Sequence, residues 1–185
     1  MPYVGQTITD VFPTSINVDT ATIATANISN QLTDANMSAG SAVQVVNVQS
    51  GAVATGTTAM PLDDTIPQIT EGDEYMTLAI TPTSASNKLK IEVAINGAST
   101  SADEIAALFV GTTANALNVG SRTSSGNWRQ QLNILHYMDS GATSELTFRV
   151  RAGGTSGTYT FNGHSSARTY GGTFISSITI TEIAV

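Results

Sequence analysis

The pattern of apolar residues changes near residue 42 of this 185-residue chain. Before that point, single apolar residues recur at intervals of four or five in a stretch of Thr, Ala, Asn, Ser and Asp, at Val18, Ile23, Ile28, Leu32 and Met37. This spacing fits neither the helical period of about 3.6 residues nor the two-residue period of a strand. So few apolar side chains cannot offset the entropy lost on ordering the backbone. The stretch is therefore expected to stay disordered or to be ordered by other chains.

Beyond residue 42, short alternating segments are separated by Gly, Ser, Thr and Asn, which is typical of an all-β domain. The clearest is 88–95, where Leu89, Ile91, Val93 and Ile95 share one face. Further strands are expected at 42–48, 75–81, 105–110, 128–138, 145–151, 158–161 and 174–185. About eight to ten strands joined by polar turns predict a jelly-roll-like β-sandwich head.

Two segments of the predicted head have an ambiguous sequence pattern: the one that follows Ser101 and the one that contains Glu182. Ser101 followed by Glu104 resembles a helix cap, but 109–112 closes like a hairpin, and we favour a strand. In the last strand, Glu182 occupies an apolar position, which suggests a bulge or a bend at the end of that strand.

Residues 1–40 are interpreted as an arm and stalk, and residues 41–185 as the head. Residues 1–17 contain Pro2 and Pro13 and suit extended contact with another protein. For residues 18–40, bundling of identical copies explains the spacing better than a loose linker. We therefore predict a homotrimer whose stalk side chains stack around a threefold axis.

Composition and charge exclude several classes of protein. Thr and Ser number 47, charged residues are only 11% of the chain, and cysteine is absent, which removes disulfide scaffolds and thiolate metal sites. Residues 1–87 carry eight acids and no Lys or Arg, so a nucleic-acid partner is not expected. No segment resembles a signal peptide or a membrane span. We expect synthesis in a cytoplasm and no membrane insertion.

Enzymatic chemistry is not indicated. His136 and His164 are the two candidate bases at neutral pH, and neither lies in a known catalytic motif, so no catalytic residue is assigned. The acids of the 63–74 segment could hold Ca²⁺, but no ligand spacing matches an EF-hand, and a solvated acidic loop is the favoured interpretation: Asp63, Asp64, Glu71, Asp73 and Glu74. No cofactor or metal is predicted.

Large polar-tipped side chains cluster in two Gly- and Ser-rich connections, around 122–128 and 164–172. Aromatic faces stack on sugar rings and Arg binds carboxylates in a bidentate manner, so these loops are candidates for binding surface polysaccharide. The alternative is that Trp128 belongs to the core and the arginines are scattered rim charges. The candidate receptor-binding residues are Arg122, Trp128, His164, Arg168 and Tyr170.

Several short motifs resemble, in their order along the chain, a group of small phage virion proteins described as tail-fibre, head-fibre or decoration proteins. They are YVGQT at 3–7, TDV at 9–11, TIATANI at 22–28, GSAVQVV at 40–46, ITPTSASNKL at 80–89, FRVRAG at 148–153 and SITITEIA at 177–184. The resemblance implies a homotrimer, an N-terminal segment attached to another virion protein, and a C-terminal β-sandwich knob. It implies no particular receptor and no catalytic residue.

Two functions are compatible with this resemblance, and both place the protein in the virion. One is a short adsorption fibre whose head loops bind a host surface glycan. The other is a decoration or head-fibre protein that stabilises or ornaments the capsid shell. The number of copies per particle discriminates between them, because decoration proteins are numerous and tail fibres are few.

Overall fold

The computed structural model describes residues 37–123 and 127–185. The predicted arm and the stalk positions Val18, Ile23, Ile28 and Leu32 lie outside the described residues. Met37, the last of the predicted stalk positions, is described and is half-buried.

The described residues form β-strands and one short 3-10 turn, η2 (Tyr170–Gly172). The strands are β1 (Ala42–Ser50), β2 (Ala54–Gly56), β3 (Asp73–Ile80), β4 (Lys88–Ser99), β5 (Asp103–Val110), β6 (Asn118–Thr123), β7 (Gln130–Asp139), β8 (Leu146–Gly153), β9 (Tyr159–Phe161), β10 (Gly163–His164), β11 (Ala167–Arg168) and β12 (Ser176–Ile183). The all-β prediction is confirmed, including the strand interpretation of the segment that follows Ser101.

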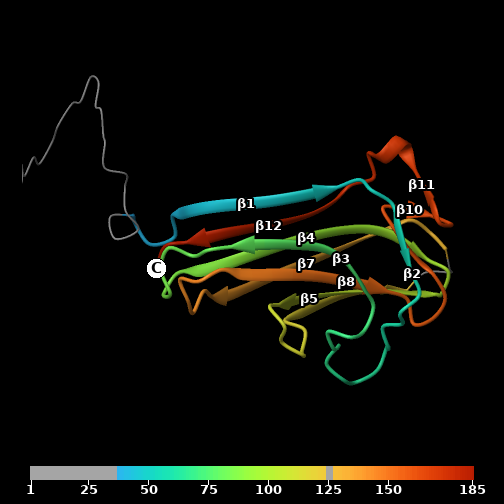
Figure 1. Ribbon diagram of the computed structural model, residues 1–185, viewed down its shortest axis with the longest axis horizontal. Helices are drawn as coiled ribbons and strands as arrows, with labels where there is room; N and C mark the ends of the chain where they lie inside the picture. The colour runs from blue at the N-terminus through green and yellow to red at the C-terminus, as the bar shows by residue number, and fades with distance from the viewer. Residues whose placement is uncertain (1–36, 124–126) are drawn as a thin grey trace, which may run out of the picture. The chain divides into compact units, whose positions relative to one another are not determined.

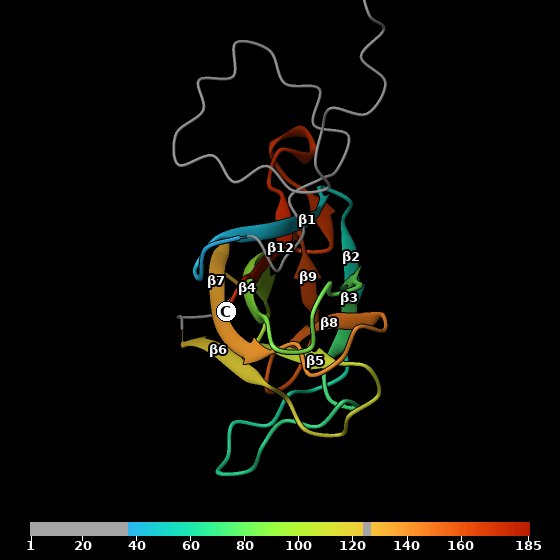
Figure 2. The same ribbon diagram turned by 90° about the vertical axis from the view of Figure 1, so that its left-hand side faces the viewer.

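Two antiparallel sheets face each other in a sandwich (Figures 1 and 2). One has the order β1-β12-β4-β9-β2 with β7 on the other side of β4, and the other has the order β3-β8-β5-β6. The long strands pair in a nested series: β1 with β12, β3 with β8, β4 with β7, and β5 with β6. Nested pairs of this kind describe a long hairpin folded over on itself, which is the jelly-roll arrangement.

The main core lies between the two sheets. Leu89, Ile91, Val93 and Ile95 are each at most 3% exposed, as their alternation predicts. Phe148 of β8 is among the residues that meet them from the facing sheet. The alternation works because one face of each strand is buried and the other faces water.

A smaller apolar cluster covers part of the second sheet. It contains Met60 from the long β2–β3 connection and Ile105, Ala107 and Phe109 from β5. Both faces of β5 are therefore buried. This is why 105–109 reads as a continuous apolar run rather than an alternating one.

Glu182 is a fully buried acid in β12. The expected irregularity lies in the partner strand: β12 runs in regular register against β4, and the bulge falls between Ala42 and Gln44 of β1. The carboxylate accepts hydrogen bonds from Gln44 Nε2 (2.6 Å), Asn87 Nδ2 (2.8 Å) and the Thr83 backbone N–H (2.8 Å). Burial alone would raise the pKa of the Glu182 carboxyl, but these hydrogen bonds outweigh it and leave the pKa below its ordinary value.

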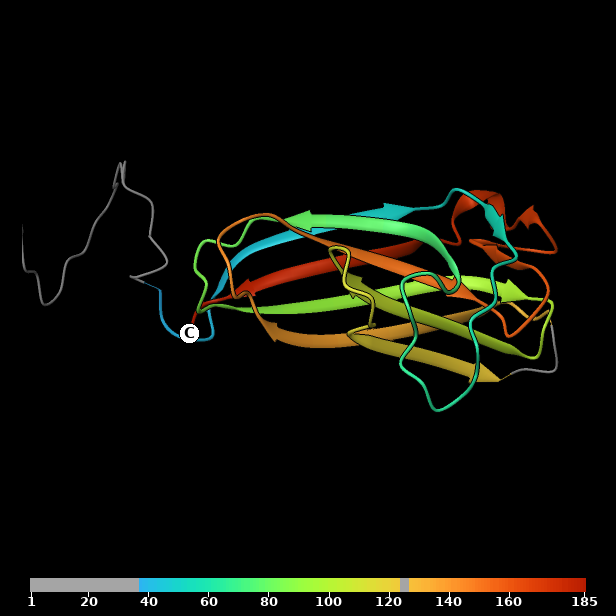
Figure 3. The same ribbon diagram turned by 60° about the horizontal axis from the view of Figure 1, so that its bottom comes forward.

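The head has a proximal and a distal end. At the proximal end, where β1 begins, the Gly40 N–H donates to Ala184 O (2.8 Å) and the Ala184 N–H donates to Ser41 O (2.9 Å). The β10–β11 hairpin and η2 lie at the opposite, distal end (Figures 1 and 3). The chain therefore enters the head at one end, and the loops that hold Trp128 and Tyr170 lie at the other.

Candidate functional site

The distal end brings together residues from three separate connections. Asn127, Trp128 and Arg129 precede β7, His164 belongs to the β10–β11 hairpin, and these four residues line a cavity of about 350 Å³. Arg168 ends the same hairpin, and Tyr170 follows it in η2. Arg122 is tied to the start of β7, because its Nη1 donates to Gln130 Oε1 at 2.6 Å. All five predicted receptor-binding residues thus lie at this end.

Backbone conformations at the distal end are unusual. Among the described residues, every non-glycine residue with positive φ lies in these loops: Asn127 (48°), Asn162 (53°), Ser165 (51°), Ser166 (61°) and Tyr170 (49°). Such conformations cost free energy and persist only where the surroundings hold them, and they are concentrated at functional sites. The surrounding residues therefore hold the backbone of the distal loops in one conformation.

Hydrogen bonds connect the Trp128 loop to the hairpin. His164 Nε2 lies 2.7 Å from Asn127 O, and His164 Nδ1 lies 3.1 Å from Ser165 Oγ. A carbonyl oxygen can only accept, so Nε2 carries a hydrogen and donates it to Asn127 O, while Nδ1 pairs with the serine hydroxyl. Asn127 Nδ2 donates to the same Ser165 Oγ at 3.0 Å, and the Asn127 N–H donates to Ser99 O at 2.6 Å. These hydrogen bonds hold the backbone of Asn127, the residue that precedes Trp128, in place.

Two large aromatic side chains face solvent at this end. Trp128 is 61% exposed and Tyr170 is 65% exposed. The alternative that places Trp128 in the core is therefore wrong. The Arg129 guanidinium lies over the Tyr170 ring, 5.5 Å from its centroid, and the Phe174 ring packs against Tyr170 in a T-shaped arrangement with the ring centroids 6.1 Å apart. A cation–aromatic pair thus stands exposed beside the cavity.

The arginines at the distal end differ from the other basic residues. The four remaining Lys and Arg side chains each meet a carboxylate: Lys88 with Asp139, Lys90 with Glu92, and both Arg149 and Arg151 with Glu74. Within the described ranges, Arg122, Arg129 and Arg168 form no salt bridge, and all three are exposed. The unpaired positive charge of the described head is therefore concentrated at one end.

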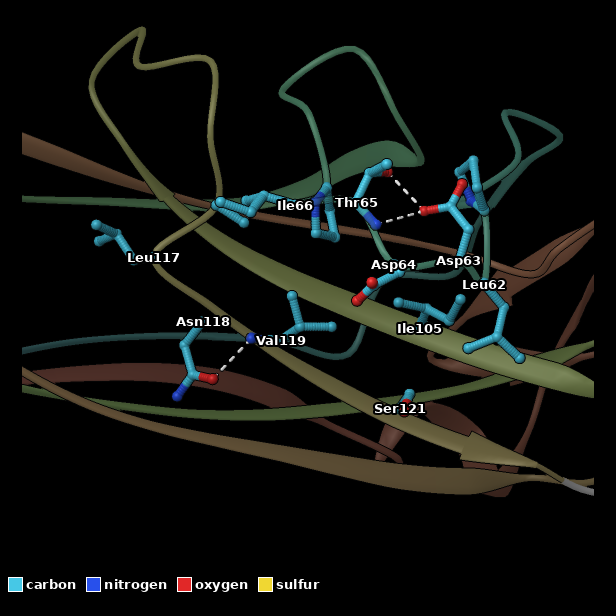
Figure 4. Close-up of a pocket in the computed structure, with 13 residues that line it drawn as sticks. Leu62, Asp63, Asp64, Thr65, Ile66, Ile105, Leu117, Asn118, Val119 and Ser121 are labelled. Carbon is cyan, nitrogen blue, oxygen red and sulfur yellow. Dashed lines mark hydrogen bonds between the residues drawn. The ribbon is translucent and has the colours of Figure 1, made fainter.

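A larger groove of about 520 Å³ lies between the β2–β3 connection and β6 (Figure 4). Exposed Leu62, Ile66 and Val119 line it, together with Asp63 and Asp64. Asp63 Oδ1 accepts from the Thr65 hydroxyl and the Thr65 N–H, and these two bonds lower the pKa of the carboxyl. Sequence reasoning missed this groove, because Leu62 and Ile66 lie in an irregular segment whose fold the residues do not reveal.

The acids of the 63–74 segment have separate partners rather than one shared centre. Glu71 accepts from the Gln68 N–H, Asp73 from Thr58, and Glu74 from Arg149. Across residues 37–123 and 127–185, no group of three or more His, Asp or Glu side chains is arranged to hold a metal ion. The structure thus lends no support to the calcium alternative.

His136, the second histidine considered above, lies in β7 at a half-buried position. Burial lowers the pKa of its imidazole, which favours the neutral ring. In the part of the chain that the structure describes, no helix has the length and apolar character needed to cross a membrane.

Comparisons with known proteins give similarity of fold only. No family model and no curated protein matches the chain. Among solved structures, Eiger TNF from S. frugiperda is 11% identical with a TM-score of 0.45, covering 76% of this chain and 93% of that chain. Latent PorU from Porphyromonas gingivalis is 11% identical with a TM-score of 0.38, covering 80% of this chain and 14% of that chain.

A structure from a virus is also among the matches. The VP2 subviral particle of infectious bursal disease virus is 10% identical with a TM-score of 0.32, covering 78% of this chain and 39% of that chain. The chain thus spans less than half of both PorU and VP2. At these identities and scores, the matches carry no argument about function. The fold assignment rests on the sheet order itself.

Proposed function

We propose that this protein is a non-enzymatic virion surface protein of a bacteriophage: a short trimeric fibre that is anchored through residues 1–40 and uses its distal loops for adsorption to a host surface glycan. The phage assignment is supported by the ordered motifs at 3–7, 22–28, 80–89 and 177–184. The adsorption role is supported by the separation of the two ends of the head. The described chain begins beside Ala184 at the proximal end, and the loops that hold Trp128 and Tyr170 lie at the opposite end from the point where the proposed anchor joins the head.

The distal loops also have the properties of a binding surface. Binding residues are commonly carried on loops that a rigid scaffold positions. Here the scaffold is the jelly roll, and the hydrogen bonds of His164 and Asn127 hold the loops in one arrangement. Exposed aromatic side chains in such an arrangement cost little entropy on binding a ligand.

A capsid decoration or head-fibre role is the second candidate. The groove lined by Leu62 and Ile66 favours it, because an exposed apolar surface on the side of the head would suit contact with a neighbouring protein of the shell. In that case the side of the head, rather than its distal end, makes the functional contact.

The test compares the full chain with a chain that begins at residue 37. This truncation keeps the Gly40–Ala184 bond, so the head should still fold. We expect the truncated chain to be absent from purified virions and to retain binding to host cells as an isolated protein. Incorporation of the truncated chain at normal copy number would refute the anchor. Many copies per particle together with no binding of the full chain to cells would favour decoration.

A further inference from the structure

The charge and aromatic pattern of the distal end identify the class of ligand that it would bind. This step rests on the proposed function and narrows it. We propose that the site formed by Trp128, Arg129, His164, Arg168 and Tyr170 binds an acidic sugar, one that carries a carboxylate or a phosphate.

The first argument is charge. The net charge of the chain is −7, yet within residues 37–123 and 127–185 the arginines that form no salt bridge all lie at the distal end. Three described acids lie toward this end: Asp103 and Glu104 at the start of β5, and Asp73 at the start of β3. Asp103 and Asp73 each accept a hydrogen bond from a threonine, and Glu104 is fully buried. Among the described residues, none of these acids forms a salt bridge with Arg129 or Arg168. A carboxylate or a phosphate matches the planar donors of these guanidinium groups, whereas a neutral ligand offers them no opposite charge.

The second argument is shape. The cavity beside Trp128 is about 350 Å³, at the small end of the range of about 300–1,000 Å³ for ligand sites. It is open to solvent, and the Trp128 side chain is part of its lining. A sugar ring fits this combination, because its C–H face packs on indole or phenol while its hydroxyl groups stay near water.

The third argument is rigidity. The Arg129 guanidinium already lies over the Tyr170 ring, and Phe174 packs against that ring in a T-shaped arrangement. A guanidinium that is positioned before binding loses less entropy when a ligand arrives. His164 acts as a positioning residue here, because its ring holds the Asn127 backbone next to Trp128.

The test measures binding of the full chain to three purified polymers by titration calorimetry: polygalacturonate, a polymer of glycerol phosphate, and neutral dextran. We expect binding to one or both acidic polymers and none to dextran. The two acidic polymers distinguish a carboxylate from a phosphate as the recognised group. Binding should weaken as salt is raised from about 50 to 500 mM, because the arginines are exposed.

Matched variants show whether binding occurs at this site. Arg129→Gln should weaken binding about tenfold, because the charge-assisted hydrogen bond between the guanidinium and the ligand is lost. Lys88→Gln removes the same charge at the proximal end and should leave binding unchanged. Trp128→Ala should weaken binding several-fold and Trp128→Phe less. A thermal melt of each variant confirms that it is folded.

Each contrary result has a defined meaning. Equal binding to dextran, equal losses in Arg129→Gln and Lys88→Gln, or equally tight binding to single-stranded DNA would overturn the acidic-sugar site. If the chain binds host cells but neither acidic polymer, the inference fails and the adsorption function stands. If it binds polygalacturonate through Arg129 but does not bind host cells, the site stands and the adsorption function fails.

Discussion

His164 Nε2 lies 2.7 Å from the carbonyl oxygen of Asn127, and this contact joins the β10–β11 hairpin to the loop that carries Trp128. Removing the ring should free the loop without unfolding the sandwich. We expect His164→Ala to accelerate amide hydrogen exchange at residues 127–129 and to lower the free energy of unfolding by about 1 kcal/mol. Gln at the same position, which can still donate to Asn127 O, should restore part of the protection. Unchanged exchange in His164→Ala would show that the contact does not hold the loop.

Trp128 and Tyr170 should behave as binding residues rather than packing residues. Both are mostly exposed, so truncating either to Ala should change the free energy of unfolding by less than about 1 kcal/mol. The control is Phe148→Ala, which opens a cavity in the main core and should cost about 3–5 kcal/mol. Denaturant titration of the three variants makes the comparison. A loss in Trp128→Ala as large as that in Phe148→Ala would contradict the surface assignment.

Glu182 should stabilise the head above pH 5 and lose this effect in acid. Its folded-state pKa lies below the unfolded value, so its contribution is present above the unfolded pKa and is lost as pH falls through the folded one. Glu182→Gln keeps an acceptor oxygen for the Thr83 N–H and Asn87 Nδ2 but turns an amide NH₂ toward the donor Gln44 Nε2 and removes the negative charge, which should cost about 1–3 kcal/mol at pH 7.

The measurement for Glu182 is the urea midpoint at pH 7 and at pH 3. The difference between wild type and Glu182→Gln should shrink at the lower pH. The exposed Glu92 supplies the control, since Glu92→Gln should change little at either pH. If the two Gln variants were equally stable at pH 7, the hydrogen bonds to Glu182 would contribute nothing.

Glu104 should have the opposite dependence on pH. Burial raises the pKa of this carboxyl from 4.5 to about 7, against the smaller effects of the Ser99 N–H bond and the Arg122 charge. Because the unfolded chain releases this proton first, the stability of the head should fall as pH rises from about 4.5 to 7, by on the order of 3 kcal/mol from this group.

Glu104→Gln removes the titrating carboxyl, so residue 104 no longer makes the free energy of unfolding depend on pH. Glu104→Gln keeps an acceptor for the Ser99 N–H, so it should match the wild type near pH 5 and exceed its stability at pH 8. Denaturation of both proteins across this range tests the assignment. Parallel curves for the two proteins would rule out Glu104 as the titrating group.

The proposed trimer has a direct test in the stalk. Native mass measurement of the full chain at micromolar concentration should show three copies. Replacing Ile23 and Ile28 by Asn should shift the mass toward that of one copy while the circular dichroism of the head stays the same. A wild-type monomer would refute the trimer.

The sequence predicts the long strands of the sandwich well, including the edge strands β1 and β3, but it misses β6 and the short strands β2, β10 and β11. In β4, Leu89 to Ile95 alternate because one face meets the core, so periodicity alone locates the strand. In β6, Asn118 to Thr123 form an edge strand with only partly covered side chains, and the segment has no apolar alternation to detect. β10 and β11 have two residues each and pair with each other, so they are too short for an alternating pattern to be detected.

The candidate site was predictable in its residues but not in its geometry. Aromatic and basic side chains in Gly- and Ser-rich connections indicated Trp128, Arg168 and Tyr170. The sequence did not show that Arg129 lies over Tyr170, because this contact depends on two loops about forty residues apart. Exposure of Trp128 was equally hidden, since an indole in a strand-rich chain suits a core as well as a surface.

The pairing of β1 with β12 determines when the head can fold. β1 leaves the ribosome early, yet its hydrogen-bond partner is the last strand of the head, and that strand also separates β1 from β4 in the sheet. Contacts between segments so far apart in sequence form slowly. Until β12 pairs with it, the unpaired edge of β1 can form non-native hydrogen bonds with other chains. The first sheet therefore closes only after synthesis reaches Ile183. Arms of neighbouring copies could meet before their heads are complete, so assembly and folding would compete during biosynthesis.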